Sequence, residues 1–154
     1  MSCNTIDKFF DNYVKAGDTA ASFNELNLLS KHADPRIRRR VAENVRTSEK
    51  ILTRLSLDEN TDVRIAVGTN PVAPHAIKQL LSEDPDATVR LGLAHDVLMP
   101  EDILQILLED NNAWVSGEAR RTLEIVAHNR RLVSGCAEFS DWKKRKDERS
   151  ARLG

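Results

Sequence analysis

The sequence has few of the residues that stabilise small secreted domains. Only two cysteines occur in 154 residues, Cys3 and Cys136, and they are too few and too far apart for a disulfide framework or a cysteine metal site. No stretch approaches 18 consecutive apolar residues, which excludes a membrane-spanning helix. The start of the chain lacks the basic region and apolar run of a secretory signal. We therefore expect a protein of the reducing cytoplasm that does not associate with membranes.

The sequence patterns of common catalytic sites are also absent. There is no glycine-rich phosphate loop, no nucleophile elbow and no pair of carboxylates in an identifiable cleft. The four histidines are scattered and do not have the spacing of metal ligands. We therefore expect a protein that is not an enzyme and that has no cofactor and no metal.

Charge is distributed unevenly along the chain, although its net charge is only −1. Residues 29–54 hold eight Lys or Arg against three Asp or Glu, and residues 113–154 hold ten against six. Residues 55–112 hold three Lys or Arg against eleven Asp or Glu. The chain is thus basic toward both ends and acidic in the middle, a pattern that affects association more than fold.

What the sequence does contain is a repeat of 26 residues, which appears as columns of similar residues at that spacing. Asp and Asn are strong N-cap residues, so one polar column predicts helices that begin near residues 34, 60, 86 and 112. A Ser/Pro column predicts a second set near 22, 48, 74 and 100. Three of the columns are Leu29, Leu55, Leu81 and Leu107; Ile37, Val63, Val89 and Val115; and Asp34, Asn60, Asp86 and Asn112.

Each repeat therefore reads as a pair of short helices, each about 15 Å long. A single pair cannot bury its apolar faces, whereas stacked pairs can. The expected fold is all-α, an α-solenoid of about four repeats over residues 22–126 within a single domain, 1–134. A helix over 4–16 is expected to cap the N-terminal end, and 135–154 is either a basic C-terminal helix or a flexible, solubilising tail.

At these repeats the chain resembles known families. The segments LSLDENTDVRIAV and LSEDPDATVRLGL are similar to HEAT-type repeats, in which leucines and an aspartate precede a Val-Arg pair. The segment VGTNPVAPHAIKQLLSED more closely resembles the leucine-rich repeat variant family, whose units pair short helices across an Asn-Pro turn, and the short period favours it. Some members of that family hold an iron–sulfur centre in an N-terminal cysteine cluster. Because only Cys3 lies near that end, no such cofactor is expected here.

An arginine column and an aspartate column predict contacts between repeats. The arginine column ends in Ser116, whereas the aspartate column begins with His32, so the two columns lack members at opposite ends. If each arginine binds the aspartate of the next repeat, no buried charge lacks a partner. The resemblance to HEAT-like proteins implies a ladder of the same kind, although contact with a phosphate or other ligand is the alternative. The predicted pairs are Arg38–Asp58, Arg64–Asp84 and Arg90–Asp110.

The segment RIRRR, residues 36–40, is the sharpest basic cluster. Ile37 faces the core of the predicted helix, which leaves Arg36, Arg39 and Arg40 largely exposed, and Arg46 follows soon after. These arginines are either a solvated end of the stack or a site for the phosphates of nucleic acid or for an acidic protein. No aromatic residue interleaves the cluster, which argues against stacking of single-stranded bases.

Trp114 occupies a column whose other members, Arg36, Asp62 and Thr88, are polar. An aromatic residue at an exposed position is either covered by the chain or part of a binding surface. We expect the segment that contains Phe139 and Trp142 to cover it, and a partner surface is the alternative.

The sequence as a whole predicts a non-catalytic scaffold that recognises a protein partner through its repeat surface. In related solenoids the second helix of each pair commonly lines the concave face. That resemblance points to the helices that begin near 48, 74 and 100, where Glu49, His75 and Glu101 share one column. The alternative is a nucleic-acid-binding protein that uses Arg36, Arg39, Arg40 and Arg46 together with the basic C-terminal segment.

Overall fold

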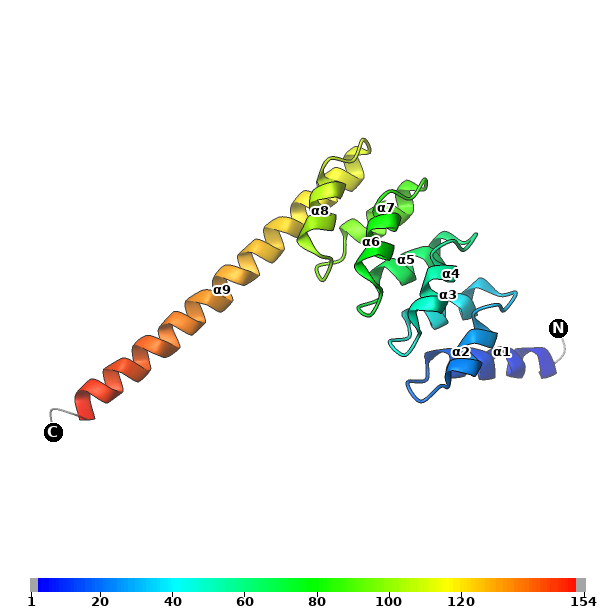
Figure 1. Cartoon of the computed structure of the whole chain (residues 1–154), viewed down its shortest axis with the longest axis horizontal. Coiled ribbons are helices and arrows are strands. Elements are labelled where there is room, and N and C mark those ends of the chain that lie inside the picture. The colour runs from blue at the N-terminus through cyan, green and yellow to red at the C-terminus, as the bar shows by residue number, and fades with distance from the viewer. Residues whose placement is uncertain (1–2, 152–154) are drawn as a thin grey trace.

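The computed structural model describes the backbone of residues 3–151 and the side chains of residues 6–132. Every regular element in this range is a helix, which confirms the all-α class (Figure 1). None of the helices in this range is long and apolar enough to cross a membrane. The elements are α1 (Cys3–Gly17), α2 (Phe23–Leu29), α3 (Pro35–Glu43), α4 (Glu49–Leu55), α5 (Thr61–Thr69), α6 (His75–Ser82), α7 (Ala87–Ala94), α8 (Glu101–Leu108) and α9 (Ala113–Ala151).

The helices begin where the two cap columns predict. The side chain of Asp34 accepts a hydrogen bond from the backbone N–H two residues later at 2.9 Å, and so does the side chain of Asn60 at 3.0 Å. Asp86 and Asn112 make the same bond at the starts of α7 and α9. Helices α2, α4, α6 and α8 begin directly after Ser22, Ser48, Pro74 and Pro100. Side-chain caps therefore set the starts of α2, α3, α5, α7 and α9, whereas α4, α6 and α8 begin without a side-chain cap bond.

The helices form two rows that share a core. Helices α1, α3, α5, α7 and α9 pack one against the next, and we call them the odd row. Helices α2, α4, α6 and α8 form the even row on the other side, where α6 packs against α8. The buried aliphatic side chains of both rows meet between them, for example Ile37, Leu52, Val63 and Leu104, each with no exposed surface. Successive helix pairs follow one another along the body of the molecule in Figure 1.

α9 is longer than any other described helix, with 39 residues over Ala113–Ala151. Its first part packs against α7 and α8, and the rest extends away from the stack in Figure 1. At 1.5 Å per residue, its length is about 58 Å. The C-terminal segment was expected to be either a helix or a flexible tail, and the structure describes it as part of α9 up to Ala151. α9 runs through residue 134, where we expected the domain to end. Residues 152–154 lie outside the described range.

Hydrogen bonds from asparagine side chains join successive helices of the odd row. Asn70 is the C-cap of α5, and its Nδ2 donates to the carbonyl oxygens of Ala42 at 2.6 Å and Asn44 at 3.2 Å. Asn44 makes the corresponding pair of bonds one helix earlier. The next member of this column is Asp96, whose carboxylate cannot donate a hydrogen bond.

Lys78 supplies the donor that Asp96 cannot. Its Nζ donates to the carbonyl oxygens of Gly68 at 2.7 Å and Asn70 at 3.0 Å. These two acceptors lie 26 residues after those of Asn70, so they are the ones that an asparagine at position 96 would bind. Lys78 stands in a column that otherwise holds leucine, and only 7% of it is exposed. Burial lowers the pKa of its ammonium, while the negative charge of Asp96 acts in the opposite direction.

Candidate functional site

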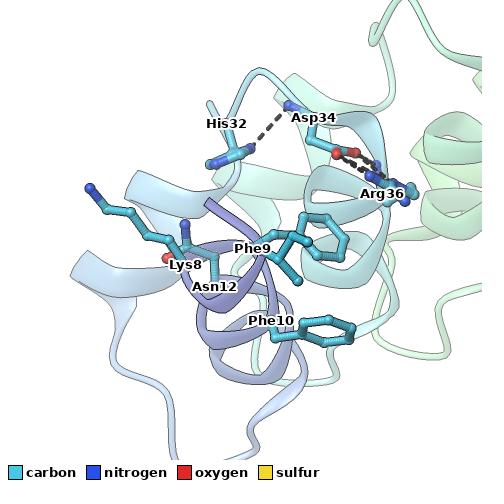
Figure 2. Close-up of a pocket in the computed structure, with 8 residues that line it drawn as sticks. Lys8, Phe9, Phe10, Asn12, His32, Asp34 and Arg36 are labelled. Atoms are coloured by element: carbon cyan, nitrogen blue, oxygen red, sulfur yellow. Dashed lines mark hydrogen bonds and ion pairs between the residues drawn. The ribbon is translucent and has the colours of Figure 1, made fainter. Parts of the chain in front are cut away.

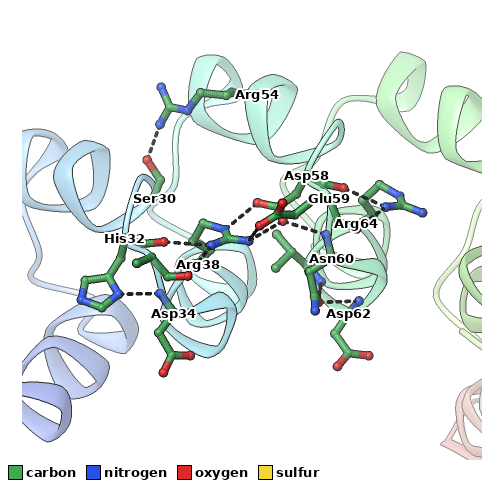
Figure 3. Close-up of polar contacts among 12 residues, drawn as sticks. Ser30, His32, Asp34, Arg38, Arg54, Asp58, Glu59, Asn60, Asp62 and Arg64 are labelled. Carbon is green, nitrogen blue, oxygen red and sulfur yellow. Dashed lines mark hydrogen bonds and ion pairs between the residues drawn. The ribbon is translucent and has the colours of Figure 1, made fainter.

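Each column arginine binds the aspartate that lies 20 residues later, through two parallel hydrogen bonds. The first pair joins Arg38 Nε to Asp58 Oδ2 at 2.7 Å and Arg38 Nη2 to Asp58 Oδ1 at 2.8 Å (Figure 3). Arg64 and Asp84 repeat this geometry at 2.7 and 3.0 Å. Arg90 binds Asp110 in the same way at 2.6 and 3.1 Å. These are the pairs between repeats that the two columns predict.

The remaining polar atoms of these pairs are also bonded within the chain. Arg64 Nη1 donates to the carbonyl oxygen of Asp58 at 2.7 Å, and Asp84 Oδ1 accepts from the backbone N–H of Asp86 at 2.9 Å. The carboxylate hydrogen bond raises the pKa of the Arg64 guanidinium. Only 13% of the Arg64 side chain and 5% of the Asp84 side chain are exposed. The arginine column therefore holds adjacent units together and has little surface left for a ligand.

His32 replaces the aspartate at the first position of this ladder. Its Nδ1 accepts the backbone N–H of Asp34 at 3.0 Å, and Asp58 Oδ1 accepts the N–H of Asn60 at the same distance. The imidazole nitrogen of His32 thus makes the same turn contact as the aspartate oxygen, but the side chain has no carboxylate to bind an arginine.

The ladder predicts a specific acid dependence of stability. The hydrogen bond from Arg90 lowers the pKa of Asp110 below the ordinary value of an aspartate. Such a group stabilises the fold above its unfolded pKa, and the contribution is lost as the pH falls through the lower, folded pKa. We expect Asp110→Asn to be less stable than wild type at pH 7. Its loss of stability between about pH 5 and pH 2 should be shallower than that of wild type, as measured by denaturant unfolding at each pH.

The basic cluster lies beside aromatic residues of α1. The Arg36 guanidinium sits 4.3 Å from the ring centroid of Phe9, and that of Arg40 lies 5.6 Å from the centroid of Tyr13. Figure 2 shows Phe9, Phe10 and Arg36 around one cavity. The interpretation that no aromatic residue interleaves the cluster is therefore wrong. The sequence around the arginines does not show these rings, because they come from a separate helix.

Acidic side chains partly neutralise the same arginines. Asp34 accepts from Arg36, with Nη2 and Oδ2 2.7 Å apart. Glu43 accepts from Arg39 Nε at 2.9 Å and from Arg40 Nη1 at 3.2 Å. Arg46 follows the C-terminal end of α3, whereas Arg36 is in its first turn, so Arg46 does not join the cluster.

Several cavities open on the surface of the odd row. One of about 640 Å³ lies between α1 and the start of α3 and includes Ile6, Phe9 and Phe10. A second, of about 310 Å³, is lined by Tyr13, Arg36, Arg39, Arg40 and Glu43. The third, of about 460 Å³, spans α5, α7 and α9 and is lined by Ile65, Thr88, Leu91, Gly92, His95, Trp114 and Glu118.

The second and third cavities use the same positions of the repeat. The 26-residue spacing therefore places their linings on the same side of the odd row, which we call the odd face. Its cationic end is at α3, and its apolar end is at α7 and α9. Its columns are Arg36, Asp62, Thr88 and Trp114; Arg39, Ile65, Leu91 and Gly117; and Arg40, Ala66, Gly92 and Glu118.

Trp114 is 80% exposed, so the expectation that the chain covers it is wrong. The reason is the course of α9, which continues as one helix and does not fold back. Position 139 lies 25 residues further along this helix, about 37 Å away along its axis. The side chains of Phe139 and Trp142 are outside the described residues. Trp114 instead lines the cavity at the apolar end of the odd face.

The positions predicted on the even row lie apart from these cavities. His75 Nε2 is 2.6 Å from Asp102 Oδ2, and Glu101 binds Arg130 of α9. Glu49 is exposed at the start of α4. None of the three described odd-row cavities includes Glu49, His75 or Glu101.

Sequence reasoning missed the contribution of α1 to the odd face. The signal was present, because Ala16 precedes Ala42, Gly68 and Ala94 at the 26-residue spacing, and α1 therefore continues the odd row.

Comparison with known proteins adds no relative, since no protein-family model, curated protein or solved structure matches the chain.

Proposed function

We propose that this protein is an α-solenoid of four 26-residue helix pairs, similar to leucine-rich repeat variant and HEAT proteins. In this proposal it is a cytoplasmic, non-catalytic scaffold that recognises a protein partner. The columns of caps and the arginine–aspartate pairs between units support the repeat assignment. The partner binds the odd face, which has the exposed Trp114 and two cavities, and not the even-row positions first expected.

The exposure of Trp114 is the observation that carries this proposal. Trp114 lies in the first turn of α9, where its backbone N–H donates to Asn112 Oδ1. Ile65 and Leu91 line the same cavity, so an apolar side chain of a partner finds an apolar environment there. Exposed tryptophans in such positions commonly contribute much of the affinity of an interface.

Trp114→Ala tests the proposal by affinity capture from an extract of the native cell. Leu98→Ala is the matched control, because Leu98 is also an apolar side chain with 80% exposure but lies outside the odd face. We expect wild type and Leu98→Ala to retain the same protein, and Trp114→Ala to bind it at least about tenfold more weakly. Equal retention by all three proteins would remove the odd face as the binding surface.

Binding of single-stranded nucleic acid is the second candidate, and the rings of Phe9 and Tyr13 beside Arg36 and Arg40 favour it. Aromatic rings and arginines together can stack bases and contact phosphates. This candidate predicts that a fluorescent oligonucleotide of about 20 bases binds at low salt and is released steeply as salt rises. Absence of binding at 50 mM salt, or a flat salt dependence, would eliminate it.

A further inference from the structure

The cavity at the cationic end of the odd face has the composition of an anion site. Three arginines, Arg36, Arg39 and Arg40, line a cavity of about 310 Å³ together with one carboxylate, Glu43. Asp34 pairs with Arg36 from outside this lining, which leaves two carboxylates for three guanidinium groups. Tyr13 of α1 lines the same cavity. Arginine forks match the oxygens of carboxylates and phosphates, which they bind through paired hydrogen bonds.

Two of the arginines of this cavity lie over aromatic rings of α1. The ring of Phe9 lies under the Arg36 guanidinium, and the ring of Tyr13 lies near that of Arg40. Such contacts limit the motion of long side chains, so less entropy is lost when they bind a ligand. The cavity therefore presents partly ordered donors and not freely moving surface charges.

Glu43 shows how an anionic group fits between two of these arginines. One of its oxygens accepts from Arg39 and the other from Arg40. Arg40 Nε is buried against Gly17 of α1 and has no hydrogen-bond partner, so it is not one of the donors that face the cavity. Glu43 bonds to one nitrogen of each of the two arginines, whose side chains remain 54% and 40% exposed to a bound anion.

We propose that this cavity binds the phosphoryl group of a phosphorylated side chain in the protein segment that the odd face recognises. The inference rests on the proposed function and names the chemistry of its partner. A phosphate dianion supplies three acceptor oxygens, which suits three arginines better than a single carboxylate does. Glu43 then acts as a resident competitor that the phosphate displaces.

The rest of the odd face favours a phosphopeptide over a nucleic acid. Beyond the cavity the surface carries Asp62, then Thr88 and Leu91, and no further row of cations. Nucleic acid requires repeated phosphate contacts along its path. α9 lies three helix positions after α3 in the odd row, roughly 27 Å at 8–10 Å between packed axes. An extended segment of about eight residues spans that distance, from the phosphate to an apolar side chain at Trp114.

Binding of N-acetyl-phosphoserine amide to the whole chain tests the site without its partner. We expect it to shift the Nε–H NMR signals of Arg39 and Arg40, more at pH 7.5 than at pH 5.5, because the second phosphate pKa is about 6. Arg40→Lys keeps the charge but loses the fork, and should weaken binding at least about tenfold. Glu43→Gln should tighten it severalfold, a gain that a merely damaged fold would not produce.

The matched control is Arg46→Gln, which removes an exposed arginine outside the cavity and should leave binding unchanged. Equal losses in Arg46→Gln and Arg40→Lys, or weaker binding in Glu43→Gln, would overturn the proposal. Tighter binding of an oligonucleotide than of a 12-residue phosphopeptide would reject it in favour of nucleic acid. Because these measurements need no cellular partner, they can fail while the Trp114 capture experiment succeeds, and the reverse also holds.

Discussion

Arg64→Ala is expected to destabilise the protein by about 3–5 kcal/mol, because the substitution leaves the buried carboxylate of Asp84 without its cation. Arg64 also donates to the carbonyl oxygen of Asp58, so one side chain joins two units. For a chain of this size the loss corresponds to a decrease of roughly 10 °C in the melting temperature. Urea unfolding followed by circular dichroism measures the free energy directly.

The control for this prediction is Arg36→Ala. Arg36 also forms an ion pair with an aspartate, but 70% of its side chain is exposed, and surface pairs contribute little. The double variant Arg64→Ala/Asp84→Ala should recover part of the loss, because it removes the unpaired charge together with its partner. If Arg64→Ala unfolds at the same urea concentration as Arg36→Ala, the ladder does not hold the units together.

The pair Lys78 and Asp96 is expected to show strong coupling in a double-mutant cycle. Lys78→Leu restores the leucine of the neighbouring units but leaves the carbonyl oxygens of Gly68 and Asn70 without their donor. Asp96→Asn alone introduces a second donor where Lys78 already binds. The double variant restores both members of the repeat, so asparagine should rescue the leucine variant by about 1–2 kcal/mol.

A pH titration provides a separate check on Lys78. The pKa of its ammonium is lower in the folded chain than its unfolded value of 10.5. Between the two pKa values the unfolded chain holds more protons, so the free energy of unfolding should rise with pH up to about 10.5. Lys78→Leu should lack this rise. Two results would contradict the exchange of roles between Lys78 and Asp96. One is a double variant whose change in stability is the sum of the two single changes, and the other is a rise of stability with pH that persists in Lys78→Leu.

The periodic part of the fold could be predicted from the sequence because each feature there repeats. Asp34 and Asn60 act as caps through bonds to residues two positions away, so local sequence determines them. The pairing of Arg64 with Asp84 followed from His32 and Ser116, which replace the charged residues at opposite ends of the two columns. Such a rule needs only that no buried charge lacks a partner.

The surface features could not be predicted in the same way, because they depend on the course of the chain outside the period. The exposure of Trp114 is set by the direction in which α9 continues, and no local residue encodes this direction. The rings of Phe9 and Tyr13 reach the arginines of α3 only through packing between helices. Lys78 also breaks its column, and its role became visible only when its acceptors were known.

His32 and Ser116, which stand at the two ends of the ladder, avoid unpaired buried charges and also affect contacts between copies of the protein. His32 offers no carboxylate to an arginine of another molecule, and Ser116 offers no guanidinium in return. Two copies placed end to end therefore cannot reproduce the contact that joins adjacent units within one chain. Stacked proteins whose two ends are complementary can grow into open filaments, and neither end of this ladder supplies its half of an arginine–aspartate pair for such a contact.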